Sequence, residues 1–225
     1  MVIELIVTLC VELVPTILSL IIIRILLKKN KSDFVTNKLL SLSLFLVGMY
    51  SFLTFLYTLI AKADVIKILL LISFLCILVA LVFLYFTIQV VLHSNMWLNG
   101  REKWVWILLT AVIFVMMVTS DFITVTDEIQ ALTEFDPIIY YIYAGFVLFV
   151  LCFSAIQTYR IGIRQTKDEF LKKKMKNFFY ALISLIFALL VDAIGGMVEI
   201  AEVYFDIGLF GLISIALILM EKAMK

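Results

Sequence analysis

The chain has 225 residues, of which 65% are hydrophobic and 16% are charged, and its formal net charge is +1. A soluble domain is nearer half apolar and a quarter charged, so the composition excludes a soluble globular protein. The apolar residues form continuous runs of about 18–25 residues or more, the helix length that crosses about 30 Å of hydrocarbon. A transmembrane β-barrel would instead alternate polar and apolar residues. The sequence therefore predicts an all-α, polytopic membrane protein.

Seven apolar runs follow one another with short connections, which predicts a single seven-helix transmembrane domain over residues 1–225. The start of the chain lacks a basic region and a cleavage site, so we expect a first span rather than a signal peptide. The longest connection runs from Asp121 to Pro137, and Asp136-Pro137 predicts a helix cap at its end. The predicted spans cover residues 2–27, 39–61, 65–92, 104–123, 138–158, 177–193 and 204–220.

Charge along the chain predicts the orientation. If successive connections alternate between two sides, every Lys and Arg except Lys62 and Lys67 falls on the side of the C-terminus, and most acids fall on the other side. Cytoplasmic connections of membrane proteins carry the excess of Lys and Arg. We therefore expect the N-terminus outside and the C-terminus inside. Trp97, Trp104 and Trp106 then cluster at the inner boundary, where interfacial tryptophans are common.

An acidic set near the outer ends of the spans is the first candidate site, for a cation or a cationic ligand. Glu199, Glu202 and Asp206 are spaced to share one helix face, while Asp192 ends the preceding span and Glu12 lies in the first. Ionisable groups at membrane depth are costly and tend to be functional. The alternative is that these acids are solvated outside the head groups. Glu12 and Asp192 are the two expected below the interface.

The basic segment Arg160 to Lys176 is the second candidate. It predicts either a docking surface for a cytoplasmic partner or an ordinary topology determinant that contacts anionic lipid. Residues 159–164 are expected to continue the fifth span as a helix, which gives an elongated helix–turn–helix on the inner face. The residues expected to contact lipid or a partner are Arg160, Arg164, Lys172, Lys173, Lys174 and Lys176.

Catalytic, metal and cofactor motifs are not found. Cys10, Cys76 and Cys152 are widely spaced within apolar runs and suggest no metal or disulfide framework. His93 is the only histidine, which excludes bis-His ligation, and its expected place at the inner end of the third span favours an interfacial polar role over a place in a nucleophilic triad. The sequence also lacks HExxH and a phosphate loop, and the last span has no lysine for a retinal. We therefore expect no enzyme activity, no metal and no cofactor.

Glycine and proline bear on the transport alternative. Many transporters interrupt their spans with Gly or Pro in two repeated halves, whereas this chain has two prolines and no clear repeat. Small residues also let helices approach closely. We therefore interpret Gly48, Gly145, Gly208 and Gly211 as helix-packing positions.

The layout resembles the seven-span sensor region at the N-terminus of many archaeal and bacterial histidine kinases and related signalling proteins. The residues that carry the resemblance are the basic stretch Tyr159-Arg160…Lys172-Lys173-Lys174-Met-Lys176 and the acidic, glycine-containing turn before a final span rich in Leu and Ile. The resemblance implies a signalling role. The chain stops at Lys225, before the usual kinase module, so a partner would have to supply the output.

These observations predict a sensor- or receptor-like module in an archaeal or bacterial plasma membrane. A ligand, lipid or ion would act on the outer acidic face or the bundle interior, and spans five to seven would pass the change to a cytoplasmic signalling partner. A transporter or channel subunit that uses Glu12 and Asp192 is the alternative, and a structural subunit of a larger complex is a third. Anionic lipid is expected at the inner face and nucleic acid is not; a homo-oligomer is compatible with the sequence.

Overall fold

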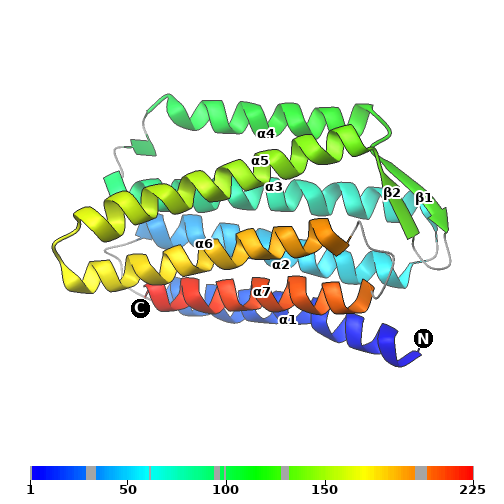
Figure 1. The fold of residues 1–225 in the computed structure, drawn as a ribbon, viewed down its shortest axis with the longest axis horizontal. Helices are drawn as coiled ribbons and strands as arrows, with labels where there is room; N and C mark the ends of the chain where they lie inside the picture. The colour runs from blue at the N-terminus through cyan, green and yellow to red at the C-terminus, as the bar shows by residue number, and fades with distance from the viewer. Residues whose placement is uncertain are drawn as a thin grey trace.

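The computed structural model describes residues 2–28, 34–60, 62–93, 97–98, 100–127, 132–195 and 202–224. Within these residues the chain forms seven α-helices that run alternately in opposite directions (Figure 1). The helices are α1 (Val2–Lys28), α2 (Phe34–Leu59), α3 (Ala63–His93), α4 (Glu102–Thr119), α5 (Pro137–Gln157), α6 (Glu169–Gly195) and α7 (Glu202–Met224). Strands β1 (Ile123–Asp127) and β2 (Leu132–Phe135) lie at the end of the bundle where α1 begins, here called the hairpin end. The opposite end, where α5 is followed by α6, is called the basic end.

Six helices, α1 to α6, are long and apolar enough to cross a membrane, counted over the described residues. Helix α7 is of similar length, but it carries Asp206, Glu221 and Lys222. Much of the outer surface is apolar: Leu108 on α4 is 63% exposed and Phe187 on α6 is 55% exposed. Such a surface is stable in hydrocarbon and not in water. The protein is therefore a multi-pass α-helical membrane protein, as the sequence predicts.

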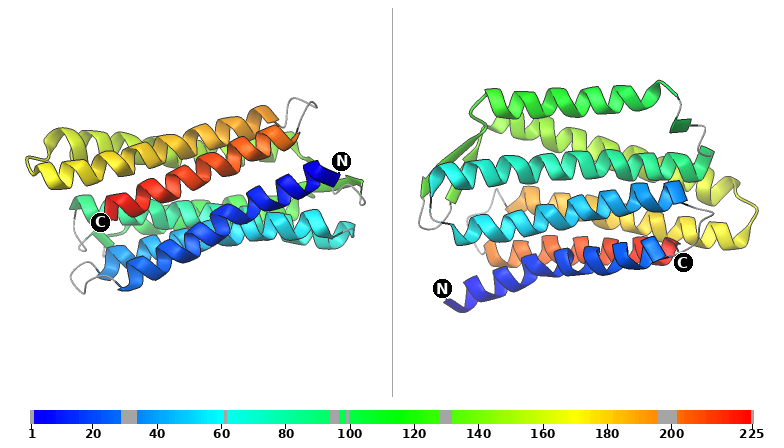
Figure 2. Two further views of the ribbon diagram at one scale, coloured as in Figure 1. Left: turned by 90° about the horizontal axis from the view of Figure 1, so that it is seen from below. Right: turned by 180° about the vertical axis from the view of Figure 1, so that it is seen from behind.

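The helices pack around a common core. Helix α1 contacts α2 and α7, α2 contacts α3, and α6 contacts α5 and α7; Figure 2 shows α7 lying between α6 and α1. Helix α4 stands at the edge of the bundle, where its main contacts are to α3 and α5. Most of the surface of α4 therefore faces outward, away from the other helices.

The connection between α4 and α5 is a β-hairpin, which the sequence did not predict. Ile123 pairs with Phe135 across antiparallel strands, and Phe122 and Ile123 are each 1% exposed. The rings of Phe122 and Phe135 lie 5.4 and 5.5 Å from that of Phe74 on α3. The expected fourth span, to residue 123, was too long, because α4 ends at Thr119 and the chain turns at Asp121.

Asp121 makes this turn with a positive φ of 48°, a conformation that Asp tolerates better than most residues. Its carboxylate accepts a hydrogen bond from Lys67 Nζ at 2.8 Å. The ammonium group of Lys67 lowers the pKa of Asp121 below its ordinary value. The side chain of Asp121 is 92% exposed, so this ion pair contributes little to stability.

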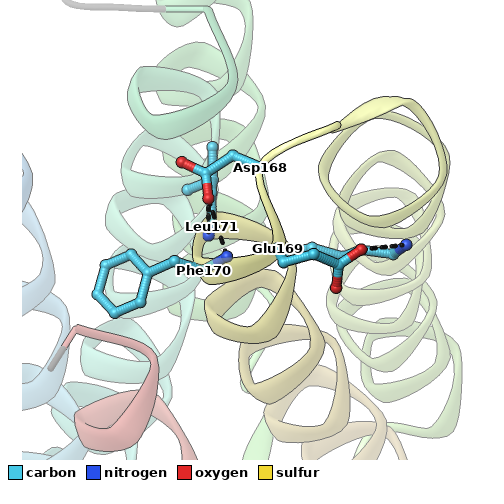
Figure 3. A network of polar contacts seen from close by, with 5 residues as sticks. Asp168, Glu169, Phe170 and Leu171 are labelled. Carbon is cyan, nitrogen blue, oxygen red and sulfur yellow. Dashed lines mark hydrogen bonds and ion pairs between the residues drawn. The ribbon is translucent and has the colours of Figure 1, made fainter.

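Two predictions about the helix ends of α5 are confirmed. Asp136 caps α5, because its carboxylate accepts a hydrogen bond from Ile139 N at 3.0 Å and Pro137 takes the first helical position. The helix also continues past Gln157, as expected, but residues Thr158–Gln165 form a π-helix. Asp168 then caps α6 through the backbone amides of Phe170 and Leu171 at 2.8 and 3.3 Å (Figure 3).

The glycine predictions are only partly confirmed. A side chain at Gly48 would collide with the Ser19 hydroxyl, and one at Gly208 would lie 3.1 Å from Val191 Cγ1. A Cβ at Gly145 or Gly211 would meet nothing within 4 Å, so those two are not packing positions. Gly162 on the π-helix is a packing position that the sequence did not reveal, since a Cβ there would lie 2.8 Å from Met175 Cγ.

Candidate functional site

A cavity of about 90 Å³ lies within the bundle and is lined by residues of α2, α3, α5, α6 and α7. Its walls are almost entirely aliphatic or aromatic, as at Leu81, Val147 and Ile213. The hydroxyl of Ser43 also faces this region, but it donates to the carbonyl of Ala80 at 2.8 Å. The cavity therefore presents apolar walls to a ligand along most of the cavity's length.

Asp192 lines the cavity near its hairpin end, three residues before the last residue of α6. Among the described residues that line the cavity, it is the only Asp, Glu, Lys or Arg. Its Oδ2 accepts a hydrogen bond from the Tyr140 hydroxyl at 3.3 Å. Tyr50 and Tyr143, which also line the cavity, lie within electrostatic range of the same carboxylate.

Aromatic rings accompany the carboxylate. The ring centroids of Phe74 and Tyr143 are 4.9 Å apart in an edge-to-face arrangement, and both residues line the cavity with Tyr50. A carboxylate beside aromatic rings, with no lining cation, favours a positively charged group. The cavity is smaller than the roughly 150 Å³ apolar cavity that holds a benzene molecule. It therefore suits a small organic cation with a short apolar body.

Glu12 does not belong to this cavity, although it was expected to share a site with Asp192. It is 2% exposed on α1, and its Oε2 has no hydrogen-bond partner among the described residues. The side chain of Thr58 on α2 lies beside the carboxyl group, and Asp206 on α7 is within electrostatic range. The neighbouring Ser51 hydroxyl donates to the backbone carbonyl of Glu12. Glu12 and Asp206 thus form a separate acidic pair between α1, α2 and α7.

The remaining acids of the predicted outer site stay predictions. Glu199 lies outside the described residues. Glu202 begins α7, four residues before Asp206, but the structure describes its backbone and not its side chain. The two therefore share one helical face by spacing alone.

The basic residues gather where they were expected, at the end of the bundle opposite the hairpin. Arg160 and Arg164 are exposed on the π-helix, and Lys173 and Lys176 are exposed on α6. Two further lysines are partly buried: Lys172 pairs with Glu169 at 3.3 Å, and Lys174 lies 4.4 Å from the Phe170 ring. Figure 3 shows this start of α6. These residues make this end of the bundle basic, and they are called here the basic face.

Sequence reasoning found Asp192 but missed its tyrosines and the cavity. Tyr140 and Asp192 are 52 residues apart, and Tyr50 lies on a third helix. Their position within apolar runs was a signal, because a buried tyrosine hydroxyl needs a polar partner. The pairing itself depends on which helices are neighbours.

No group of three or more His, Cys, Asp or Glu residues that could hold a metal occurs in the described part of the chain. No protein-family model matches the sequence, and no curated protein matches it either. The class to which the protein belongs is thus defined by its own fold, that of a multi-pass α-helical membrane protein whose described residues include a central cavity lined by Asp192.

Proposed function

We propose that the protein is a seven-span membrane sensor that binds a small organic cation in its central cavity. The observation that carries this proposal is the placement of Asp192 among tyrosines at one end of an otherwise apolar cavity. An amine held there would pair its charge with Asp192 and place its alkyl part against the aliphatic walls. Burial of each methylene group contributes about 0.8 kcal/mol.

The proposal includes an orientation, with the hairpin end outside and the basic end inside. Basic side chains concentrated at one end of the bundle support it, because cytoplasmic segments carry the excess of Lys and Arg. It also includes a membrane-spanning α7, whose central residues from Ile207 to Met220 are uncharged. A prokaryotic plasma membrane is the proposed location, in keeping with the resemblance to sensor regions of histidine kinases.

The proposed output passes through α5, α6 and α7, which all line the cavity. At the basic end, the π-helix after α5 packs on α6, where Gly162 leaves room for Met175. π-Helical segments are rare in proteins, and those that occur are often found at functional sites. A ligand shifts such a structure only if it binds one helix arrangement more tightly than another. The basic face would present the change to a cytoplasmic partner.

The test is binding of n-butylammonium to the purified protein in detergent, measured by calorimetry and by the thermal unfolding midpoint. We expect saturable binding that raises the midpoint. Asp192→Asn should weaken it at least tenfold, because the substitution keeps the size of the side chain and an acceptor for Tyr140 while removing the charge. n-Butanol, which has the same apolar body without charge, should bind more weakly than n-butylammonium, and butyrate should not bind.

Glu134→Gln is the matched control, because Glu134 is an exposed acid on β2 at the same end of the bundle. It should leave the affinity unchanged. Equal binding of n-butylammonium by the wild type and Asp192→Asn would contradict the proposal.

Transport is a second candidate function, supported by the buried, partly unpartnered carboxylate of Glu12 in mid-span. Proteoliposomes loaded with labelled n-butylammonium separate the two functions. If the protein is a sensor, the flux from these proteoliposomes does not exceed the flux from loaded liposomes without protein. If a flux is observed and Asp192→Asn abolishes it, transport replaces the sensor proposal. If the flux also depends on Glu12, both acids lie in the transport pathway.

A further inference from the structure

A second cavity, of about 680 Å³, lies near the basic end between α3, α4 and α5. It shares no lining residue with the central cavity. Helix α4 stands at the edge of the bundle, and the space beside it is open to the surroundings rather than enclosed. Its size is within the range of about 300–1,000 Å³ that is typical of small-molecule pockets. It is called here the aromatic groove.

Four aromatic rings line the groove. Tyr85, 3% exposed on α3, packs against Trp97, Trp106 and Phe153, with ring centroids 5.7, 4.7 and 6.1 Å from its own. The three neighbours come from the segment after α3, from α4 and from α5. Rings from several elements around one space form the kind of wall that binds quaternary and other ammonium groups through cation–π contacts.

The groove carries a carboxylate. Among the described residues that line it, Glu102 at the start of α4 is the only acid, His93 is the only other titratable group besides Tyr85, and Lys and Arg are absent. Glu102 Oε2 accepts a hydrogen bond from Trp97 Nε1 at 3.0 Å, which holds the carboxylate against the aromatic wall. Glu102 is also within electrostatic range of Tyr85. The groove thus combines a fixed anion with aromatic faces.

The amides of the buried Gln89 and the half-buried Gln157 add a polar floor. Gln89 is 2% exposed on α3 and donates to Gln157 Oε1 on α5. Both side chains line the groove, and each amide retains hydrogen-bonding capacity beyond this single bond. Polar side chains at this depth are costly unless satisfied, so their place on a cavity wall points to a polar ligand.

We propose that the aromatic groove binds the ammonium head group of a zwitterionic phospholipid. The head group would lie between Glu102 and the rings of Trp97 and Trp106, and the acyl chains would follow the exposed apolar face of α4, where Val105 and Leu108 are 56% and 63% exposed. The phosphate would remain at the basic end, where Arg101 is exposed next to Glu102. This site differs from the basic face, which favours anionic lipid.

The experiment uses fluorescence of the Trp104→Phe protein in detergent micelles. Trp104 is 57% exposed and does not line the groove, so its removal leaves Trp97 and Trp106 as the only tryptophans. The quenchers are phospholipids with dibrominated acyl chains and ethanolamine, choline or glycerol head groups. We expect ethanolamine or choline lipid to quench at a concentration at least fivefold lower than phosphatidylglycerol. A preference for ethanolamine indicates a primary ammonium, and one for choline a quaternary ammonium.

Glu102→Gln should abolish the preference, because glutamine keeps an acceptor for Trp97 and loses the charge. Glu169→Gln, an exposed acid at the same end and outside the groove, should retain it. Equal quenching by all three lipids would show ordinary annular contact, and an unchanged preference in Glu102→Gln would show that Glu102 does not select the head group; either result would overturn the proposal. If Trp104→Phe does not fold, native mass spectrometry of wild type and Glu102→Gln with the same lipid mixture gives the same comparison through the retained lipid.

Discussion

At the scale of single residues, small residues bring α1 and α2 into close contact. The Thr16 hydroxyl donates to the carbonyl of Gly48 at 3.1 Å, and the Ser19 hydroxyl donates to Thr16 O at 2.8 Å. A Cβ on Gly48 would collide with this Ser19 hydroxyl. Within a membrane, where no hydrophobic force holds helices together, such close packing and hydrogen bonding support association.

We expect Gly48→Ala to destabilise the protein by about 1–3 kcal/mol, the usual cost of overpacking, despite the higher helix propensity of alanine. The thermal unfolding midpoint in one detergent measures the effect. Gly145→Ala is the matched control, since its Cβ would meet nothing within 4 Å, and it should be neutral or stabilising by up to about 1 kcal/mol. Adding Ser19→Ala to Gly48→Ala should restore part of the loss. Equal midpoints for the two glycine variants would contradict this account.

The residue scale also shows where sequence reasoning stops. The cap at Asp136 could be predicted because its partner, Ile139 N, is three residues away. The hydrogen bond between Tyr140 and Asp192 could not, because it depends on α5 lying beside α6. Gly48 and Gly145 look alike in the sequence, yet one faces another helix and the other faces outward. Spacing along the chain does not separate these cases.

At the scale of elements, the turn between α4 and β1 shows how a short connection redirects the chain. Apolar runs of about 18–25 residues predict helices well, whereas the strands Ile123–Asp127 and Leu132–Phe135 are too short and too mixed to stand out. They form because Phe122 and Phe135 pack on Phe74 of α3, a contact between distant segments. Only the neighbouring helix makes the hairpin stable, since an isolated hairpin is marginal.

Three substitutions at Asp121 separate its backbone role from its charge. Asp121→Gly, Asp121→Asn and Asp121→Val all remove the ion pair with Lys67, so differences among them report the positive φ. We expect thermal stability to fall from Gly or Asn to Val, with Val about 1–3 kcal/mol below Gly, because a β-branched residue is strained at φ 48°. Ser120→Val is the control, since Ser120 has φ −108°. If Asp121→Val equals Asp121→Gly, the turn does not constrain the fold.

At the scale of the whole molecule, hydropathy was sufficient to predict a multi-pass helical protein, and the charge pattern placed the basic residues at one end. The order of the helices around the core was not predictable, because the outer faces and the inner faces of α1 to α6 are both apolar. Their mutual packing depends on small contacts such as Gly48 with Ser19 and Gly162 with Met175. The central cavity and the aromatic groove follow from that packing.

Cysteine labelling on intact cells tests the orientation and the seventh span together. The background replaces Cys10, Cys76 and Cys152 with alanine, and single cysteines replace the exposed residues Glu134, Lys173 and Lys222. The proposed topology predicts that a membrane-impermeant maleimide labels Glu134→Cys on intact cells, because the hairpin end faces out. Lys173→Cys and Lys222→Cys should react only after permeabilisation.

The position at residue 222 distinguishes the outcomes. If α7 does not cross the membrane, the end of the chain stays on the side of the hairpin, and Lys222→Cys reacts together with Glu134→Cys. If the orientation is inverted, Lys173→Cys reacts on intact cells and Glu134→Cys does not, which would contradict the sorting of basic residues to the cytoplasm. Labelling of all three after permeabilisation shows that each thiol is accessible. An inverted orientation would also place Asp192 on the cytoplasmic side, so the same labelling decides from which side a cation reaches the central cavity.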